Sequence, residues 1–349
     1  MDDLTRAIRY PFNTPPEHGA SIEVAEGVHW MRLPLPMTLD HVNCYALDDG
    51  DGWTVVDTGF DTRKSRGIWE SLLNGPLKGK AVTRVLVTHH HPDHIGLAGW
   101  FQESGAELIT TRTAWLFARM LSLDVQEVAS DQAVTFWQQA GMRPDLLEAR
   151  KTDRPFNFAD VIAPLPLGFT RIKQGDEITI GGRRWRVHSG NGHAPEHATL
   201  WSLDDNLVIG GDQLLPSISP NLGVYPTEPE ADPVAEWLES CKYFQSLAEN
   251  HHLVLPGHKL PFTGLPFRLE QLIDNHRSAL ARLEEFLQIP HTATDCFKTL
   301  FKRDIGEGEY GLALVEAMSH CLHLWHQGRV KRTLRTDGAY EWTSTGAAT

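Results

Sequence analysis

Residues 88–96, THHHPDHIG, contain four histidines and one aspartate within nine positions. Imidazole and carboxylate groups are ligands of Zn²⁺ and related ions, and a site needs three or four of them at one point. The run follows AVTRVLV, a β-branched stretch typical of a strand. Because alternate side chains of an extended segment point the same way, His89 and His91 can share one ion, and Asp93 and His94 can face a second. His90 falls between them and is expected to point away.

Three more groups of this kind follow apolar, strand-like runs farther along the chain. They are His193 in GNGHAPEH, Asp212 in IGGDQ and His258 in LPGHK. Glycines beside them permit close approach of the backbone, and binding groups at strand ends are how α/β scaffolds build sites. We therefore predict one centre for two metal ions, built from His89, His91, Asp93, His94, His193, Asp212 and His258.

The combination resembles the signature of the metallo-β-lactamase-fold superfamily, which is H-x-H-x-D-H followed by a distant His, Asp and His. The matching motifs span residues 28–262. The resemblance implies an α/β (α+β) fold, an αββα sandwich of two mixed sheets with helices outside and metals at one edge. It also implies three ligands for each ion and one bridging carboxylate: His89, His91 and His193 for the first ion, Asp93, His94 and His258 for the second, and Asp212 between them.

Two further residues are expected beside the ligands. Asp57 in VVDTG matches the carboxylate with which the family orients a ligand histidine. The alternative is a buried acid that caps the next turn. His197, four residues after His193, is expected to support the ligands rather than to bind an ion.

Such a centre is expected to perform hydrolysis. Two divalent ions that share a water lower its pKa, so that hydroxide is present at neutral pH and attacks an electrophilic carbonyl or phosphorus. Asp93 and Asp212 can orient this nucleophile and receive its proton, so they are the predicted catalytic residues. The mixture of neutral imidazole with few carboxylates favours Zn²⁺, with Fe or Mn as alternatives.

The elements that must position these groups can be read from apolar patterning. Residues 42–56 predict a β-hairpin that ends at VVDTG, residues 62–79 and 95–103 predict helices, and residues 106–111 predict a strand. Residues 112–160 have helical periodicity and are interpreted as a cap inserted into a catalytic domain of residues 1–263. Residues 264–349 predict three helices and a β-hairpin, a winged-helix-like domain.

The substrate class is less well specified. A small ester, thioester or lactone under the helical cap is the leading hypothesis, with glyoxalase II as a comparison. Tyr225 could donate a hydrogen bond to substrate, and Trp115, Phe117 and Met120 could form an apolar wall, although ordinary packing is the simpler interpretation of all four. A mononuclear iron dioxygenase that acts on a persulfide is the main alternative.

A nucleic-acid-processing enzyme is a third hypothesis, because the tail resembles that of relatives of β-lactamase-like protein 2. The net charge of −13 argues against a polyanionic partner. Within residues 265–349 the acidic residues outnumber the basic ones, 11 against 10, and the basic run RVKRTLR is interpreted as a charged edge strand. Nucleic acid is therefore not the expected partner.

The remaining features set the cellular context. No run of about 18 apolar residues predicts a membrane span, and the amino-terminal residues lack the pattern of a signal peptide. Four scattered cysteines indicate reduced thiols, so a cytoplasmic protein is expected. A homo-oligomer is left open. His320 and His323 in HCLHLWH could share an ion, but a role in helix packing is the favoured interpretation.

Overall fold

The computed structural model describes residues 7–346. Internal contacts divide the chain into two compact units. The first consists of Met1–Val125, Asn157–Pro220 and Gln245–Leu269, and the second of Gln126–Phe156, Asn221–Phe244 and Glu270–Thr349. A boundary after residue 263 and a cap of residues 112–160 stay predictions. The contacts group Gln126–Phe156 with the carboxyl-terminal helices. The predicted domains also begin and end at termini that lie outside the described residues.

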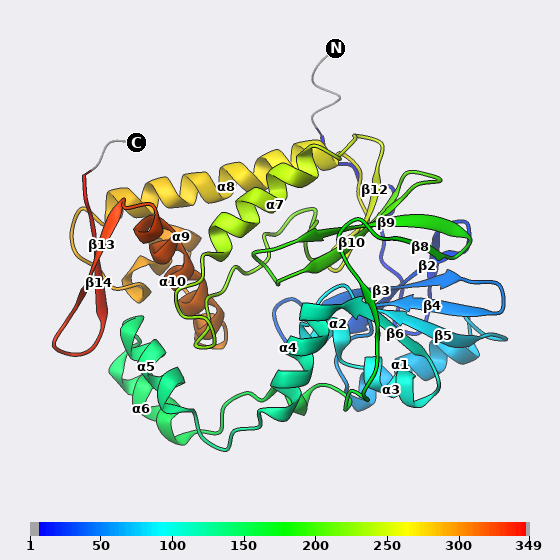
Figure 1. Cartoon of the computed structure of the whole chain (residues 1–349), viewed down its shortest axis with the longest axis horizontal. Helices are drawn as coiled ribbons and strands as arrows, with labels where there is room; N and C mark the ends of the chain where they lie inside the picture. Colours follow the sequence, from blue (N-terminus) through cyan, green and yellow to red (C-terminus); the bar gives the residue numbers. More distant parts are fainter. Residues whose placement is uncertain (1–6, 347–349) are drawn as a thin grey trace, which may run out of the picture. The chain divides into compact units, whose positions relative to one another are not determined.

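The first unit contains a seven-stranded sheet with its strands in chain order (Figure 1). Neighbouring strands are antiparallel from β1 to β4 and parallel from β4 to β7. The strands are β1 (Ile22–Ala25), β2 (Val28–Pro34), β3 (His41–Asp48), β4 (Gly52–Val56), β5 (Ala81–Leu86), β6 (Glu107–Thr111) and β7 (Thr170–Ile172). The ends of the parallel strands β4 and β5 therefore bring VVDTG and the histidine run to the same edge of the sheet.

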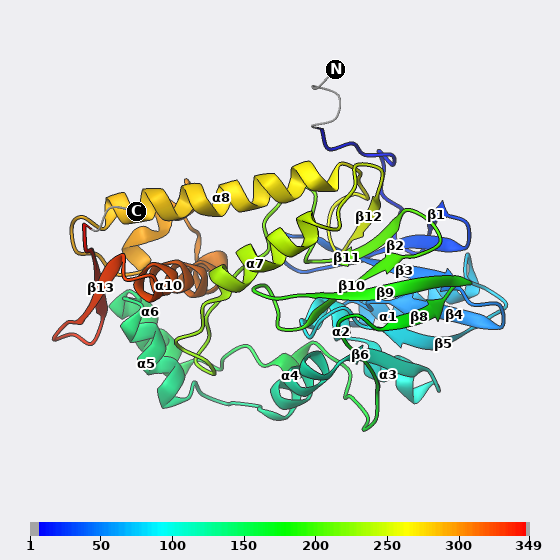
Figure 2. The ribbon, with the colours of Figure 1, turned by 45° about the horizontal axis from the view of Figure 1, so that its top comes forward.

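A five-stranded sheet of the first unit has the order β12-β11-β10-β9-β8. Its strands are β8 (Glu177–Ile180), β9 (Arg183–Gly190), β10 (His197–Ser202), β11 (Leu207–Gly211) and β12 (Leu253–Pro256). The two sheets lie face to face (Figure 2). Buried side chains of both, among them Trp30, Tyr45, Trp185 and Leu200, form one core between them.

Helices cover the outer face of the seven-stranded sheet. They are α1 (Arg63–Asn74), α3 (Ala98–Glu103) and α4 (Arg112–Leu123), and the single turn α2 (Pro92–Ile95) directly precedes α3. A second core joins α1 and α3 to the sheet, and within it the rings of Trp69 and Phe101 meet edge to face at 5.0 Å. The predicted αββα sandwich is confirmed.

The second unit is mainly helical. It contains α5 (Asp131–Gln139), α6 (Pro144–Thr152), α7 (Pro233–Gln245), most of α8 (Leu265–Phe286), α9 (Phe297–Phe301) and α10 (Tyr310–His326), followed by the hairpin of β13 (Val330–Leu334) and β14 (Tyr340–Ser344). Three carboxyl-terminal helices and a hairpin lie where the sequence predicted them; the likeness to a winged helix stays a prediction. Among residues 7–346, no helix combines the length and apolar character needed to cross a bilayer.

Candidate metal centre

The predicted ligands come from four chain segments that end at one edge of the sandwich. His89, His91, Asp93 and His94 follow β5, and the other three lie in the β9–β10 loop, after β11 and after β12. The structure brings their donor atoms together in three groups, each with all atoms within 4.8 Å of one another. These groups are His89 with His91 and His193, His89 with His94 and Asp212, and Asp93 with His94 and His258.

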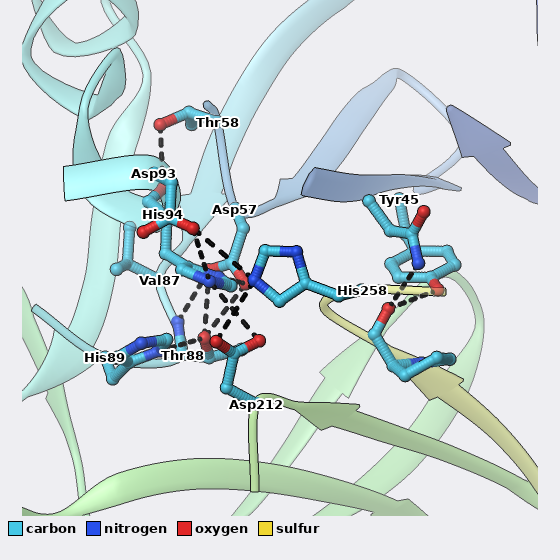
Figure 3. Close-up of polar contacts among 12 residues, drawn as sticks. Tyr45, Asp57, Thr58, Val87, Thr88, His89, Asp93, His94, Asp212 and His258 are labelled. Atoms are coloured by element: carbon cyan, nitrogen blue, oxygen red, sulfur yellow. Dashed lines mark hydrogen bonds and ion pairs between the residues drawn. The ribbon is translucent and has the colours of Figure 1, made fainter. Parts of the chain in front are cut away.

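Asp212 lies between the two sets of histidines. Its Oδ2 is 3.4 Å from Nε2 of His193 and 3.2 Å from Nε2 of His258, and its Oδ1 is 3.4 Å from Nε2 of His94. His94 and His258 also contact Asp93. The Oδ2 atom of Asp93 is 3.4 Å from Nε2 of His258 (Figure 3). A carboxylate in contact with both sets is what a bridging ligand requires.

The nitrogens that face away from the centre are already hydrogen-bonded. Nδ1 of His94 lies 2.7 Å from Asp57 Oδ2, Nδ1 of His258 lies 2.7 Å from the His41 carbonyl, and Nδ1 of His89 lies 3.0 Å from the Thr88 hydroxyl. Donation from Nδ1 leaves the lone pair of Nε2 free to bind a cation.

Donor atoms that face the centre include several without a hydrogen-bond partner. Nε2 of His89, Nε2 of His94 and Oδ1 of Asp212 are buried and make no hydrogen bond. Buried polar atoms are normally satisfied, so unmatched ones call for another partner. Imidazole and carboxylate atoms at this spacing fit divalent cations.

The charges of the metal-free centre support the same conclusion. Burial opposes ionisation of His94, but the carboxylates of Asp212, Asp93 and Asp57 outweigh it and hold its pKa well above the usual value. Burial likewise opposes the charge of His258, yet Asp212 and Asp93 raise its pKa to about 10. The carboxylates therefore attract positive charge, which protons supply when no metal ion does.

The comparisons with known proteins agree with this geometry. The family model of the metallo-beta-lactamase superfamily matches residues 37–258, which hold every predicted ligand. The chain belongs to the metallo-beta-lactamase superfamily. A second model, the metallo-beta-lactamase-like C-terminal domain, matches residues 280–345. The resemblance drawn from the histidine motif is thus confirmed, and the chain is a metal-dependent hydrolase of this superfamily.

Individual relatives cover nearly all of the chain. A solved beta-lactamase domain protein from Burkholderia ambifaria is 35% identical, covers 99% of this chain and 100% of its own, and superimposes with a TM-score of 0.90. A metallo-beta-lactamase family protein from Thermus thermophilus is 26% identical, with 92% of this chain and 99% of its own covered and a TM-score of 0.77. The probable metallo-hydrolase YqjP of Bacillus subtilis (strain 168) is 26% identical over 84% of this chain and 91% of its own.

The two residues predicted to support the ligands lie beside the predicted ligands. Asp57 contacts His94, as expected. His197 accepts a hydrogen bond from the backbone N–H of Asp212 through Nε2 at 3.1 Å, and its ring stacks on His89 at 4.4 Å. Burial lowers the pKa of His197 to about 3, so the ring is neutral and able to accept. His197 thus contacts the backbone of one predicted ligand and the ring of another.

His90 points away from the donor cluster, as the strand pattern predicted. Its ring lies 5.1 Å from that of Phe117 on α4, and burial lowers its pKa to about 3. Phe117 therefore packs against the metal-binding loop. Trp115 stacks on Phe169 at 5.0 Å, which is ordinary packing, and Met120 is exposed.

Sequence reasoning missed His41. The backbone carbonyl of His41 lies within hydrogen-bond distance of His258 Nδ1. The Nε2 atom of His41 accepts a hydrogen bond from the Lys259 N–H at 2.9 Å, and its Nδ1 lies 2.6 Å from Asp40. The residue stands alone in LDHVN, 217 positions from His258, so no local motif marks it. From the opposite sheet, it contacts the predicted ligand that follows β12.

Residues of the second unit behave as packing groups. Nδ1 of His320 lies 2.8 Å from the Glu316 carbonyl, whereas Nδ1 of His323 lies 2.9 Å from Asp232. Because the two rings have different partners, and no group of possible metal ligands within residues 7–346 includes them, a shared ion is not supported. Tyr225 also belongs to the second unit and is partly exposed. Its role toward substrate stays a prediction.

Proposed function

We propose that the chain is a binuclear zinc-dependent hydrolase that opens a small ester, thioester or lactone. One observation carries the proposal: Asp212 contacts histidines of both donor sets, His193 on one side and His94 and His258 on the other. A carboxylate in that place supports two ions at bridging distance rather than one.

The bound ions would supply a hydroxide at neutral pH and a Lewis acid for the developing oxyanion. The protein itself holds the predicted ligand side chains in place. Asp57, Thr88 and the His41 carbonyl hold three ligand rings with Nε2 toward the centre. Asp93 and Asp212 lie where a carboxylate can orient the nucleophile and receive its proton. Asp93 is the more exposed of the two.

Five imidazoles against two carboxylates support Zn²⁺ over the harder Mg²⁺ or Ca²⁺. Iron and manganese accept the same ligands, and one iron per chain would instead favour the persulfide dioxygenase. Metal content therefore separates the two hypotheses before any substrate is known.

The arginines of the basic run RVKRTLR are paired with acidic residues, which argues against a nucleic acid substrate. Arg329, Arg332 and Arg335 each pair with an acidic residue: Glu284, Glu230 and Asp337. The Arg332 guanidinium also lies 4.3 Å from the centre of the Trp325 ring. Charges neutralised in this way offer little to a phosphate backbone, so a small molecule is the proposed substrate.

A panel of p-nitrophenyl esters, acyl thioesters and lactones with the zinc-loaded chain tests the proposal. Turnover of at least one carbonyl class, lost in Asp212→Asn, is the expected result. Absence of turnover across the panel, together with oxygen uptake on a glutathione persulfide by the iron-loaded chain, would contradict it.

A further inference from the structure

Glu196 occupies an unusual backbone conformation between His193 and His197. Its φ is 49°, in the left-handed region that side chains other than glycine rarely adopt. Among residues 7–346 the other non-glycine residues with positive φ are Asp57, Lys259 and Lys302. Asp57 contacts His94 and Lys259 follows His258, so three of these four strained positions adjoin predicted ligands. Strain of this kind persists where surrounding contacts enforce it, and it gathers at functional sites.

The enforcing contacts of Glu196 are specific. Its backbone N–H donates to Asn191 Oδ1 at 2.9 Å. Its carboxylate Oε2 accepts from the backbone N–H of Thr113 at 2.9 Å and from the Thr113 hydroxyl. Arg171 lies 3.9 Å from the other carboxylate oxygen.

Thr113 lies in the first turn of α4, where backbone N–H groups lack partners within the helix. A carboxylate there satisfies one such donor and is stabilised by the positive end of the helix dipole. The N-cap Thr111 satisfies the N–H of Ala114, and Glu196 satisfies that of Thr113 from a loop 83 residues away.

Helix α4 makes a second contact with the predicted metal-binding loops, in which the ring of Phe117 packs against that of His90. α4 thus touches the loop of His89 and His91 through one side chain and the loop of His193 through another. These two loops supply the three histidines predicted for the first ion.

We propose that Glu196 is a positioning residue that fixes His193 to the amino terminus of α4. Binding of the first ion and the order of α4 then depend on each other. The inference rests on the metal centre proposed above, but it concerns a residue outside the ligand set.

The test compares Glu196→Gln and Glu196→Ala with Glu107→Gln. Glu107 is a matched control because its carboxylate accepts from the Thr170 hydroxyl in the same unit, away from the donor cluster. Zinc release to a chromogenic chelator is followed in time, and hydrogen exchange of residues 112–118 is measured with zinc bound and after its removal. Neither readout needs a substrate.

We expect Glu196→Ala to release one of two zinc ions about 10–100-fold faster than the wild type, the usual effect of losing a group that orients a ligand. Glu196→Gln should show a smaller change and Glu107→Gln none. In the wild type, removal of zinc should accelerate exchange at the start of α4, and in Glu196→Ala that segment should exchange fast with or without zinc.

Should Glu196→Ala fold poorly, Thr113→Val removes the hydroxyl partner alone and should still accelerate release of one ion. The inference would be overturned if Glu196→Ala and Thr113→Val released zinc at the wild-type rate and hydrogen exchange of α4 did not depend on zinc. That result would leave the metal centre intact. A wild-type chain that retains no zinc would overturn the metal centre itself and the inference with it.

Discussion

Asp57 Oδ2 lies 2.7 Å from Nδ1 of His94, and Asp57 Oδ1 accepts from the backbone N–H of Thr88 at 2.9 Å. The Thr88 hydroxyl in turn lies 2.9 Å from Asp57 Oδ2 and 3.0 Å from Nδ1 of His89. One buried carboxylate therefore orients a ligand of each proposed ion, directly for one and through a threonine for the other.

Asp57→Asn should weaken zinc binding about 10–100-fold. The amide cannot accept both from His94 and from Thr88 at the oxygen positions that the carboxylate offers, so both rings lose their fixed orientation. Competition against a chelator of known affinity measures the change, and the thermal midpoint of the metal-free chain controls for misfolding. Unchanged affinity would mean that Asp57 caps its turn and nothing more.

Asp212→Asn should retain the fold but lower the zinc content below two per chain. It should also reduce turnover by at least about 100-fold, because a ligand matters at least as much as the groups that orient one. Elemental analysis and steady-state rates of the same preparation check both expectations. Full turnover by this variant would refute a bridging role.

Zinc binding should release protons at neutral pH. The folded pKa of His94 is raised well above its usual value and that of His258 to about 10, so both rings are protonated in the metal-free protein near pH 7. Zinc needs neutral imidazole, so binding displaces about two protons, and affinity falls as pH falls. Calorimetry in two buffers of different ionisation enthalpy counts the protons; a heat independent of the buffer would contradict the expectation.

The sequence signal was strongest where ligands cluster locally. Alternation along an extended segment predicts that His89 and His91 face the same way and that His90 points away. Asp93 and His94 lie in the helical turn α2, and their division from His89 and His91 between two ions is what the resemblance to the superfamily implies. The same reasoning finds His193, Asp212 and His258, because each follows an apolar strand.

Contacts between distant segments could not be predicted in this way. His41 and Glu196 act through partners 217 and 83 residues away, and nothing in their local sequence indicates those partners. Helix α7 and strands β1 and β2 were also not predicted. The helix expected over residues 62–79 ends at Asn74, because Gly75 and Pro76 stop it before the second glycine. The grouping of Gln126–Phe156 with the second unit depends on packing, which periodicity does not show.

Glu316 in the second unit should make stability depend on pH. Burial raises its pKa to about 7 from an ordinary value of 4.5, although Asn221 donates to it at 2.8 Å. Because the folded state then binds more protons than the unfolded state between pH 4.5 and 7, stability falls as pH rises through that window. Glu316→Gln removes this loss and should be more stable than the wild type at pH 8 by about 3 kcal/mol, with little difference at about pH 4.5. Denaturant unfolding at both pH values measures this, and a difference independent of pH would contradict it.

Metal content distinguishes a binuclear zinc centre from a mononuclear iron site. The chain should be purified without added metal or chelator, and its zinc, iron and manganese should be counted by elemental mass spectrometry. About two zinc ions per chain are expected, with fewer in Asp212→Asn and the same number in Glu107→Gln. About one iron per chain and no zinc would contradict this expectation and would point to oxygen chemistry instead.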